Sequence, residues 1–282
     1  MTLSSASQKL TVTYRGQRFV LAFFCRQGGG DQVLFLHGLG CSKADFEGAV
    51  DVPELASYTL LALDFPGMGG SPYAAGSGLT LTDLALLAHQ FLLAIGEGRA
   101  HLVGHSMGGA VATLLAASNP RRVSSLVNVE GNLFPEDCFY SRQICLEVER
   151  RRSGLQDREE VLRMFLNQLE TKASNRDYAR NWRQNVRSSE AIVDYSRSLV
   201  DLSDAGVLFR AFRDFQGPRL FVFGEEHAEL SYLPKLAGLG IGTCSVPASE
   251  HYPHHTNPGY FYRALANWLP TARTKSGKDA LL

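Results

Sequence analysis

Short apolar runs that end in glycine-bearing turns recur along the chain and predict buried strands. Gln32–His37, Thr59–Asp64 and Ala100–His105 are rich in Leu, Val or Phe and do not strictly alternate apolar with polar positions. Strands of this kind are covered on both faces, as in a parallel sheet. Three further runs predict strands downstream: Val123–Glu130, Arg219–Phe223 and the shorter Gly242–Pro247.

Segments with apolar residues at helical spacing alternate with these runs. Leu79–Ile95 and the small-residue-rich Ser106–Ser118 predict helices, and Gly259–Leu269 predicts a final one. At the start of the chain, Leu10–Tyr14 and Phe19–Phe24 flank a glycine turn and predict an antiparallel hairpin at the sheet edge. Strands that alternate with helices over this length indicate a doubly wound, mostly parallel α/β sheet.

Residues 134–215 interrupt this alternation. They contain no convincing strand, and their apolar residues keep helical spacing throughout. Their basic side chains are nearly all arginines and are matched by almost as many acidic ones, which indicates solvated helices rather than a binding patch. We therefore predict a sheet core built from 1–133 and 216–282, with 134–215 as an all-helical cap over the carboxyl edge of the sheet.

Composition and charge narrow the range of partners. The chain has 282 residues, of which 45% are hydrophobic, so it can bury a sizeable core. Its 28 Lys and Arg residues balance 28 Asp and Glu residues, so it lacks the basic surface that nucleic acid or an anionic membrane surface requires. We expect a small-molecule substrate, no nucleic acid and no membrane. These data leave the oligomeric state open.

Two further features point to a cytoplasmic protein without bound cofactors. The N-terminus lacks the architecture of a signal peptide, and the longest apolar stretch is interrupted by Asp83, His89 and Gln90. The five cysteines form no CxxC pair, which removes the common zinc and dithiol patterns. We expect neither a metal nor an organic cofactor.

The strongest chemical signal is the sequence Gly104-His105-Ser106-Met107-Gly108. This G-x-S-x-G pattern follows a predicted strand and precedes a predicted helix. A serine on such a sharp turn is exposed for attack, and flanking glycines avoid collisions with neighbouring backbone. The helix N-terminus adds N–H groups where negative charge develops. We predict that Ser106 is a nucleophile.

A serine nucleophile needs a general base and an oxyanion hole. His251 is the best candidate for the base, because it lies in a loop between a predicted strand and the last helix; His254 and His255 are close rivals. The oxyanion donors are predicted to be the backbone N–H groups of Leu39, in the loop after Gln32–Leu36, and of Met107.

Taken together, four motifs resemble the α/β-hydrolase fold superfamily over nearly the whole chain. They are His37-Gly38-Leu39-Gly40, the turn from Asp64 to Ser71, Gly104–Gly109, and His251 seven residues before Pro258. The resemblance implies an eight-stranded sheet with a helical cap inserted after the sixth strand. It also implies that Ser106 is the nucleophile and His251 the base.

The acid of the triad departs from the common pattern of this superfamily. Most members place an Asp after the seventh strand, where this chain has Gly224-Glu225-Glu226-His227. A minority place the acid after the sixth strand, and Glu130 ends that strand here. We predict Glu130 as the acid, with Glu225 or Glu226 as alternatives, and a site without a carboxylate partner also remains open.

These residues predict a serine hydrolase with a Ser-His-Glu triad. Ester hydrolysis through an acyl-enzyme on Ser106 is the most economical reaction, with a small to medium, partly apolar substrate. Thioester hydrolysis, acyl transfer and carbon–carbon bond hydrolysis use the same groups, and a ligand-binding receptor on the same fold is the alternative from another class. Several aromatic residues of the predicted cap either line a pocket or pack the cap: Phe134, Phe139, Tyr140, Tyr178, Trp182 and Tyr195.

Overall fold

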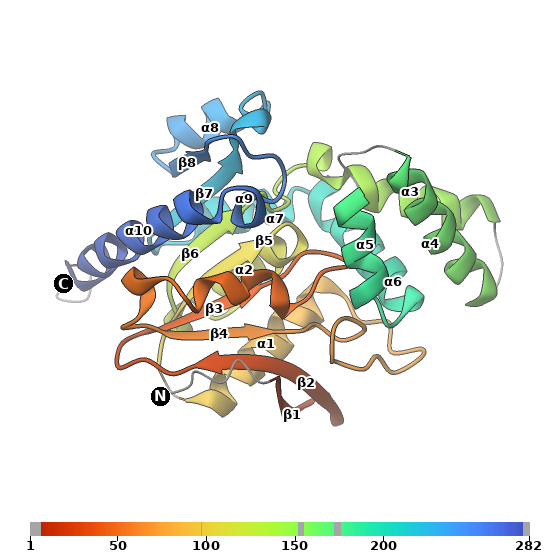
Figure 1. The fold of residues 1–282 in the computed structure, drawn as a ribbon, viewed down its shortest axis with the longest axis horizontal. Helices are drawn as coiled ribbons and strands as arrows, with labels where there is room; N and C mark the ends of the chain where they lie inside the picture. The colour runs from red at the N-terminus through yellow and green to blue at the C-terminus, as the bar shows by residue number, and fades with distance from the viewer. Residues whose placement is uncertain (1–6, 97, 152–154, 172–175, 279–282) are drawn as a thin grey trace.

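The strands form one twisted sheet, in a computed structural model that describes residues 7–96, 98–151, 155–171 and 176–278. The described residues contain eight strands in the order β1-β2-β4-β3-β5-β6-β7-β8 (Figure 1). The strands are β1 (Gln8–Tyr14), β2 (Gln17–Arg26), β3 (Gln32–Leu36), β4 (Thr59–Leu63), β5 (Ala100–His105), β6 (Val123–Val129), β7 (Arg219–Gly224) and β8 (Gly242–Val246). β2 pairs antiparallel with β1 and β4, and every later pairing is parallel. The predicted mostly parallel, eight-stranded sheet is confirmed.

The apolar runs locate the strands closely. Each of the six strands predicted after the hairpin starts at its expected residue and ends within one residue of its expected end. The hairpin of β1 and β2 lies at the sheet edge as predicted. Both of its strands are longer than predicted, because the backbone pairing extends beyond the apolar residues to Gln8 and to Arg26.

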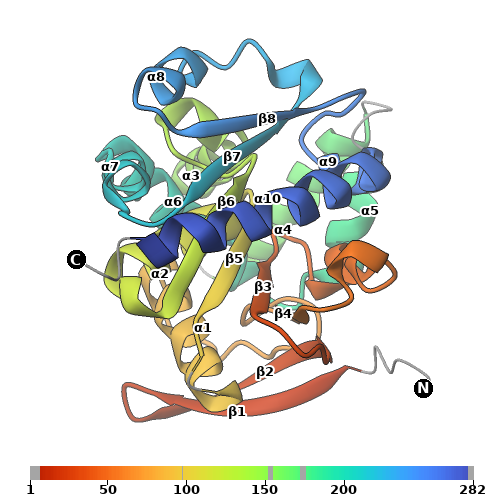
Figure 2. The ribbon, with the colours of Figure 1, turned by 90° about the vertical axis from the view of Figure 1, so that its left-hand side faces the viewer.

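Helices cover both faces of the sheet. In β3, Leu34 and Leu36 pack into one hydrophobic cluster, whereas Val33 and Phe35 pack into another on the opposite face. The first cluster contains the buried residues of α1 (Leu81–Ile95) and α2 (Met107–Ser118). The second contains those of α10 (Pro258–Lys278), which crosses that face of the sheet (Figure 2). The sheet is therefore doubly wound.

Local capping explains where α1 begins. The Thr80 hydroxyl accepts the Asp83 N–H, and the Asp83 carboxylate accepts the Thr80 N–H, which satisfies two unpaired donors of the first turn. Shorter helices connect the remaining core strands: η1 (Lys43–Ala49), η2 (Pro53–Leu55), η3 (Pro120–Arg122), η6 (Glu225–His227), α8 (Leu233–Gly238) and α9 (Pro253–Thr256). No helix in the described part of the chain is long and apolar enough to cross a membrane.

A run of helices lies between β6 and β7, and we call residues 134–215 the inserted helical segment. Its described elements are η4 (Pro135–Cys138), α3 (Phe139–Arg151), α4 (Leu155–Glu170), α5 (Arg176–Asn185), α6 (Ser189–Asp204) and α7 (Val207–Asp214). Helices α3 to α6 group together to one side of the sheet (Figure 1).

Backbone hydrogen bonds connect the inserted helical segment to the loop after β4. The Gly69 N–H donates to the Asn185 carbonyl and the Arg187 N–H donates to the Gly67 carbonyl, each at 2.8 Å. In addition, the Tyr195 hydroxyl donates to the Pro66 carbonyl at 2.8 Å. These hydrogen bonds attach the inserted helical segment to the core at a point distant in sequence from residues 134 and 215, where the segment begins and ends.

Candidate active site

Ser106 occupies a strained turn between β5 and α2. Its φ of 52° and ψ of −123° lie in a region that residues with a side chain rarely adopt. The following helix supports the turn, because the Gly109 N–H donates to the Ser106 carbonyl at 2.8 Å. Ser106 is half-buried and lines a cavity at the carboxyl ends of the strands. This is the geometry of a nucleophile elbow.

The glycines on either side of Ser106 are required by close backbone contacts. A Cβ on Gly104 would lie 2.2 Å from the Gly108 carbonyl oxygen, and one on Gly108 would lie 2.1 Å from the Leu36 carbonyl oxygen. Relief of either contact would shift α2 against a strand of the sheet, β5 in the first case and β3 in the second. The two glycines of the motif are therefore required by the close packing of α2 against β3 and β5.

The loop after β3 packs against the elbow. A Cβ on Gly38 would lie 3.3 Å from the Ser106 Cβ, so backbone and serine are in close approach. Leu39 and Met107 are buried. Within the described residues the Leu39 N–H has no protein acceptor, and the Met107 N–H belongs to the first turn of α2, where N–H groups lack a helical partner. Both residues thus lie next to Ser106, and the role of their N–H groups as oxyanion donors stays a prediction.

Glu130 lies at the end of β6 and faces two imidazoles. One of its carboxylate oxygens, Oε1, accepts the Gly224 N–H at 2.7 Å. The other, Oε2, lies 2.9 Å from Nδ1 of His227 and 3.5 Å from Nδ1 of His251. Glu130 itself has a φ of 50°, so a second strained residue lies next to the elbow.

These contacts keep the Glu130 carboxylate ionised. Burial alone would raise its pKa, but the hydrogen bonds and charges of His227 and His251 outweigh burial and lower the pKa to about 2. In turn, the hydrogen bond to Glu130 raises the pKa of His227 above its ordinary value, against the opposing effect of burial. The group is a buried carboxylate shared between two partly exposed histidines.

His105 fixes the loop that carries His251. Its Nε2–H donates to the His251 carbonyl at 2.8 Å. Burial lowers the pKa of His105 to about 3, so this imidazole stays neutral and acts as a structural donor. Since Nδ1 of His251 faces Glu130, its Nε2 is the atom left for a substrate or for Ser106.

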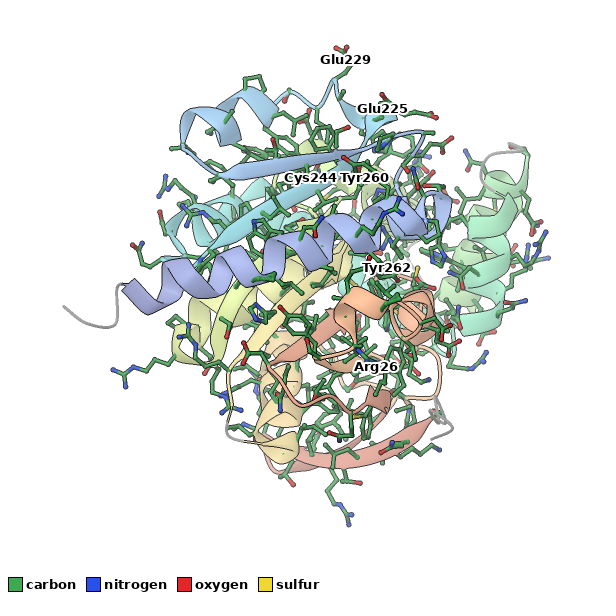
Figure 3. All side chains as sticks on the ribbon, turned by 60° about the vertical axis from the view of Figure 1, so that its left-hand side comes forward. Arg26, Glu225, Glu229, Cys244, Tyr260 and Tyr262 are labelled. Carbon is green, nitrogen blue, oxygen red and sulfur yellow. The ribbon has the colours of Figure 1, made fainter. Side chains whose placement is uncertain are left out.

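The rivals for the base and acid roles make other contacts. His254 is buried against Phe46 and does not line the cavity. His255 is exposed and lines the cavity, but its Nε2 lies 3.6 Å from Oδ1 of Asp45 rather than near Glu130. Glu225 is exposed at the periphery of the molecule, where it accepts the Ala248 N–H at 2.9 Å (Figure 3).

Glu226 is exposed as well, and neither Glu225 nor Glu226 lines the cavity. Among the described residues, the carboxylate that meets His251 is therefore Glu130.

A cavity of about 810 Å³ lies between the carboxyl ends of the strands and the inserted helical segment. The core contributes Leu39, Ser106, Glu130, His227 and His251 to its lining. This volume is in the range of small-molecule sites.

The inserted helical segment forms the wall of the cavity that faces the strand ends. Half of the aromatic residues considered above as pocket-lining lie in this wall. Phe139, Tyr140 and Tyr178 line the cavity. The other candidates pack: Trp182 is buried over Gly40, where a Cβ would lie 2.1 Å from its ring, and Tyr195 is buried on the core loop. Phe134 stacks on Tyr232.

His227 is the site residue that sequence reasoning missed. It occupies the position where the resemblance leads one to expect an Asp, and this mismatch was the available signal. The pattern could show that the position was unusual, but only the fold shows that β7 brings His227 to the same carboxylate oxygen as His251.

The fold and this arrangement at the strand ends are those of an α/β hydrolase. A model of the alpha/beta hydrolase family matches residues 33–264, and the chain belongs to that family.

Two curated relatives are similar over part of the chain. One is the dihydrolipoyllysine-residue acetyltransferase component of the acetoin cleaving system of Cupriavidus necator, 44% identical over 108 residues, or 38% of this chain and 28% of that protein. The other is the pimeloyl-[acyl-carrier protein] methyl ester esterase of Aeromonas hydrophila, 39% identical over 118 residues, or 42% of each protein. The matches thus span less than half the length of these relatives.

Solved structures agree with the fold over its full extent. A thermophilic esterase from Thermogutta terrifontis superposes with a TM-score of 0.73, at 21% identity, over 95% of this chain and 99% of that chain. At this identity the likeness concerns the fold.

Proposed function

We propose that this α/β hydrolase is a serine hydrolase that cleaves an ester-type bond through an acyl-enzyme on Ser106. The observation that carries the proposal is the convergence of Ser106, His251 and Glu130 on one cavity, with the Leu39 and Met107 N–H groups beside the serine. The similarity to a methyl ester esterase supports an ester as the bond that is cleaved.

In the first half of the reaction, Ser106 Oγ attacks the ester carbonyl carbon while Nε2 of His251 takes its proton. The negative charge that forms on the carbonyl oxygen accepts hydrogen bonds from the Leu39 and Met107 N–H groups. Glu130 stabilises the imidazolium of His251 through Nδ1. The ester C–O bond then breaks, and His251 donates its proton to the leaving alkoxide.

In the second half, a water molecule attacks the acyl carbon and His251 accepts its proton. The tetrahedral intermediate collapses, the bond to Ser106 Oγ breaks, and the proton returns to that oxygen. The carboxylic acid product leaves, and every group is back in its starting state. The chemistry of these steps requires no further group.

The cavity supports a small to medium, partly apolar substrate. Its volume is about 810 Å³, and Phe139, Tyr140 and Tyr178 form an aromatic wall opposite the strand ends. Because this wall comes from the inserted helical segment, we propose that the segment acts as a cap domain that selects the substrate. The core residues would then supply the chemistry and the inserted segment the specificity.

A fluorophosphonate probe tests the nucleophile directly. We expect the wild-type protein to be labelled and Ser106→Ala to lose labelling completely. Ser141→Ala is the matched control, because Ser141 lines the same cavity from α3 and is expected to keep full labelling. Labelling that survives in Ser106→Ala contradicts the proposal.

A substrate panel tests the bond type. Short and long esters, lactones, thioesters and vinylogous diketones should be compared by kcat/KM. We expect esters to be turned over best. Faster turnover of thioesters or diketones would move the assignment to thioester or carbon–carbon bond hydrolysis, and binding without any turnover would indicate a receptor.

A further inference from the structure

A second group of titratable side chains lies next to the proposed catalytic residues. Asp45 comes from η1, and His254 and His255 come from α9. One potential ligand atom from each residue lies within 4.8 Å of the other two. Nε2 of His255 is 3.6 Å from Oδ1 of Asp45.

Two of these side chains are buried with polar atoms that have no partner. His254 is 3% exposed, and neither of its ring nitrogens has a hydrogen-bond partner among the described residues. Oδ2 of the 6%-exposed Asp45 is equally without a partner there. Phe46 and His105 cover the ring of His254 through face and edge contacts, which leave its nitrogen atoms unsatisfied. Such atoms cost free energy unless a ligand or a water satisfies them.

The three side chains offer the donor atoms that bind a cation, two imidazole nitrogens and a carboxylate oxygen, on two neighbouring elements. Two imidazoles and one carboxylate form a common donor set for Zn²⁺ and similar cations.

We propose that Asp45, His254 and His255 bind a divalent cation of the zinc type. Asp45 and His255 also line the cavity that Ser106 lines, so the remaining coordination position would face the proposed substrate site. Three protein ligands and one open position are typical of a metal that stays accessible to small molecules.

The group of Glu130, His227 and His251 has the same donor types but fits a cation less well. Both imidazoles already lie within reach of one carboxylate oxygen, and the other oxygen accepts a backbone N–H. These polar atoms therefore have partners without an ion. A cation there would also occupy the imidazole that we propose as the base.

The ion would connect two loops of the proposed machinery. Asp45 follows the loop of Leu39, and His254 follows the loop of His251. Binding to the folded state alone raises thermal stability by mass action. We expect the melting temperature to rise by about 5 °C when free Zn²⁺ exceeds its Kd a hundredfold.

The test is a Zn²⁺ titration of the full chain after chelator treatment, by calorimetry and thermal denaturation. We expect one equivalent to bind to the wild-type protein. Asp45→Asn and His255→Gln should each weaken binding by more than about 100-fold, beyond the usual cost of losing an outer-shell partner. His227→Gln is the matched control and should bind as tightly as the wild type.

Several results would overturn the proposal. These are the absence of saturable binding to the wild-type protein, unchanged affinity in both ligand variants, or loss of binding in His227→Gln alone. The last result would place the ion on Glu130 and His251. If Asp45→Asn does not fold, the Zn²⁺ affinity of His255→Gln alone tests the proposal. That variant is expected to fold, because 44% of the His255 side chain is exposed. The readouts do not depend on turnover, so the outcome is separate from the proposed function.

Discussion

Replacing Glu130 by Gln is the sharpest perturbation of the proposed mechanism. The substitution keeps the size of the side chain and leaves an oxygen to accept the Gly224 N–H. It removes the negative charge and places an NH2 group where Oε2 now meets Nδ1 of His227 and of His251. To avoid two facing donors, His251 must carry its proton on Nε2. In that tautomer it cannot accept the Ser106 proton.

The pKa of Glu130 gives the scale of the interaction with its two histidines together that the substitution removes. Its value falls from the ordinary 4.5 to about 2 because of the two histidines, despite burial. Each pKa unit corresponds to about 1.4 kcal/mol, so the charged form is favoured by roughly 3 kcal/mol, or about 10²-fold. The side chain is 5% exposed, so solvent screens little of this energy. The wrong tautomer adds to the loss, and comparable acid-to-amide changes in serine hydrolases cost about 10⁴-fold.

The assay is steady-state hydrolysis of a chromogenic ester at neutral pH. We expect kcat of Glu130→Gln to fall between about 10² and 10⁴-fold, with a small change in KM because Glu130 acts through His251. Glu225→Gln and Glu226→Gln are the matched controls and should stay within a few-fold of wild type. Circular dichroism and thermal denaturation of each variant establish that it is folded.

The reasoning fails if Glu130→Gln keeps kcat within about tenfold of wild type while folded. It also fails if Glu225→Gln or Glu226→Gln shows the larger loss, since the acid would then follow β7. An equal loss of stability and activity would point to a structural role for Glu130 at the end of β6.

Two further predictions concern His227 and the elbow glycines. The folded-state pKa of His227 is raised, so its contribution to stability is present below about pH 6.5 and is lost as pH rises through the raised value. The melting temperature of His227→Gln should therefore differ more from that of the wild type at pH 6 than at pH 9. An equal difference at both pH values would contradict this prediction. Gly108→Ala should destabilise the protein by more than about 3 kcal/mol in chemical denaturation, because its Cβ would lie 2.1 Å from the Leu36 carbonyl oxygen. Gly98→Ala, where a Cβ meets nothing within 4 Å, should be near neutral.

The sequence located the strands better than it located the contacts between them. Buried parallel strands have short apolar runs with clear turn residues at their ends, so β3 to β7 could be delimited to about one residue. The bounds of the mostly exposed edge strand β8 were predicted as closely. The elbow could also be predicted, because its G-x-S-x-G pattern is short and continuous, although the contact that requires Gly108 is with the distant Leu36 carbonyl. The meeting of His227, His251 and Glu130 depends on three strand ends that are far apart in sequence. No local pattern encodes such a distance.

The aromatic residues of the inserted helical segment show the same limit. Helical spacing predicted that they lie on helices, but Phe139 and Tyr140 line the cavity whereas Trp182 packs on Gly40. Which face of each helix meets the core is decided by docking contacts such as the hydrogen bond from Tyr195 to Pro66. These contacts join residues more than a hundred positions apart and leave no periodic signal.

The point where Glu130 accepts the Gly224 N–H has a consequence for how such enzymes diverge. A residue that ends β6 and a residue that follows β7 reach the same location, since Glu130 and His227 touch there. Two carboxylates could not both stay ionised at so short a distance, so one of the two positions must carry a neutral or basic side chain when the other carries the acid. In this chain the acid follows β6 and the imidazole follows β7.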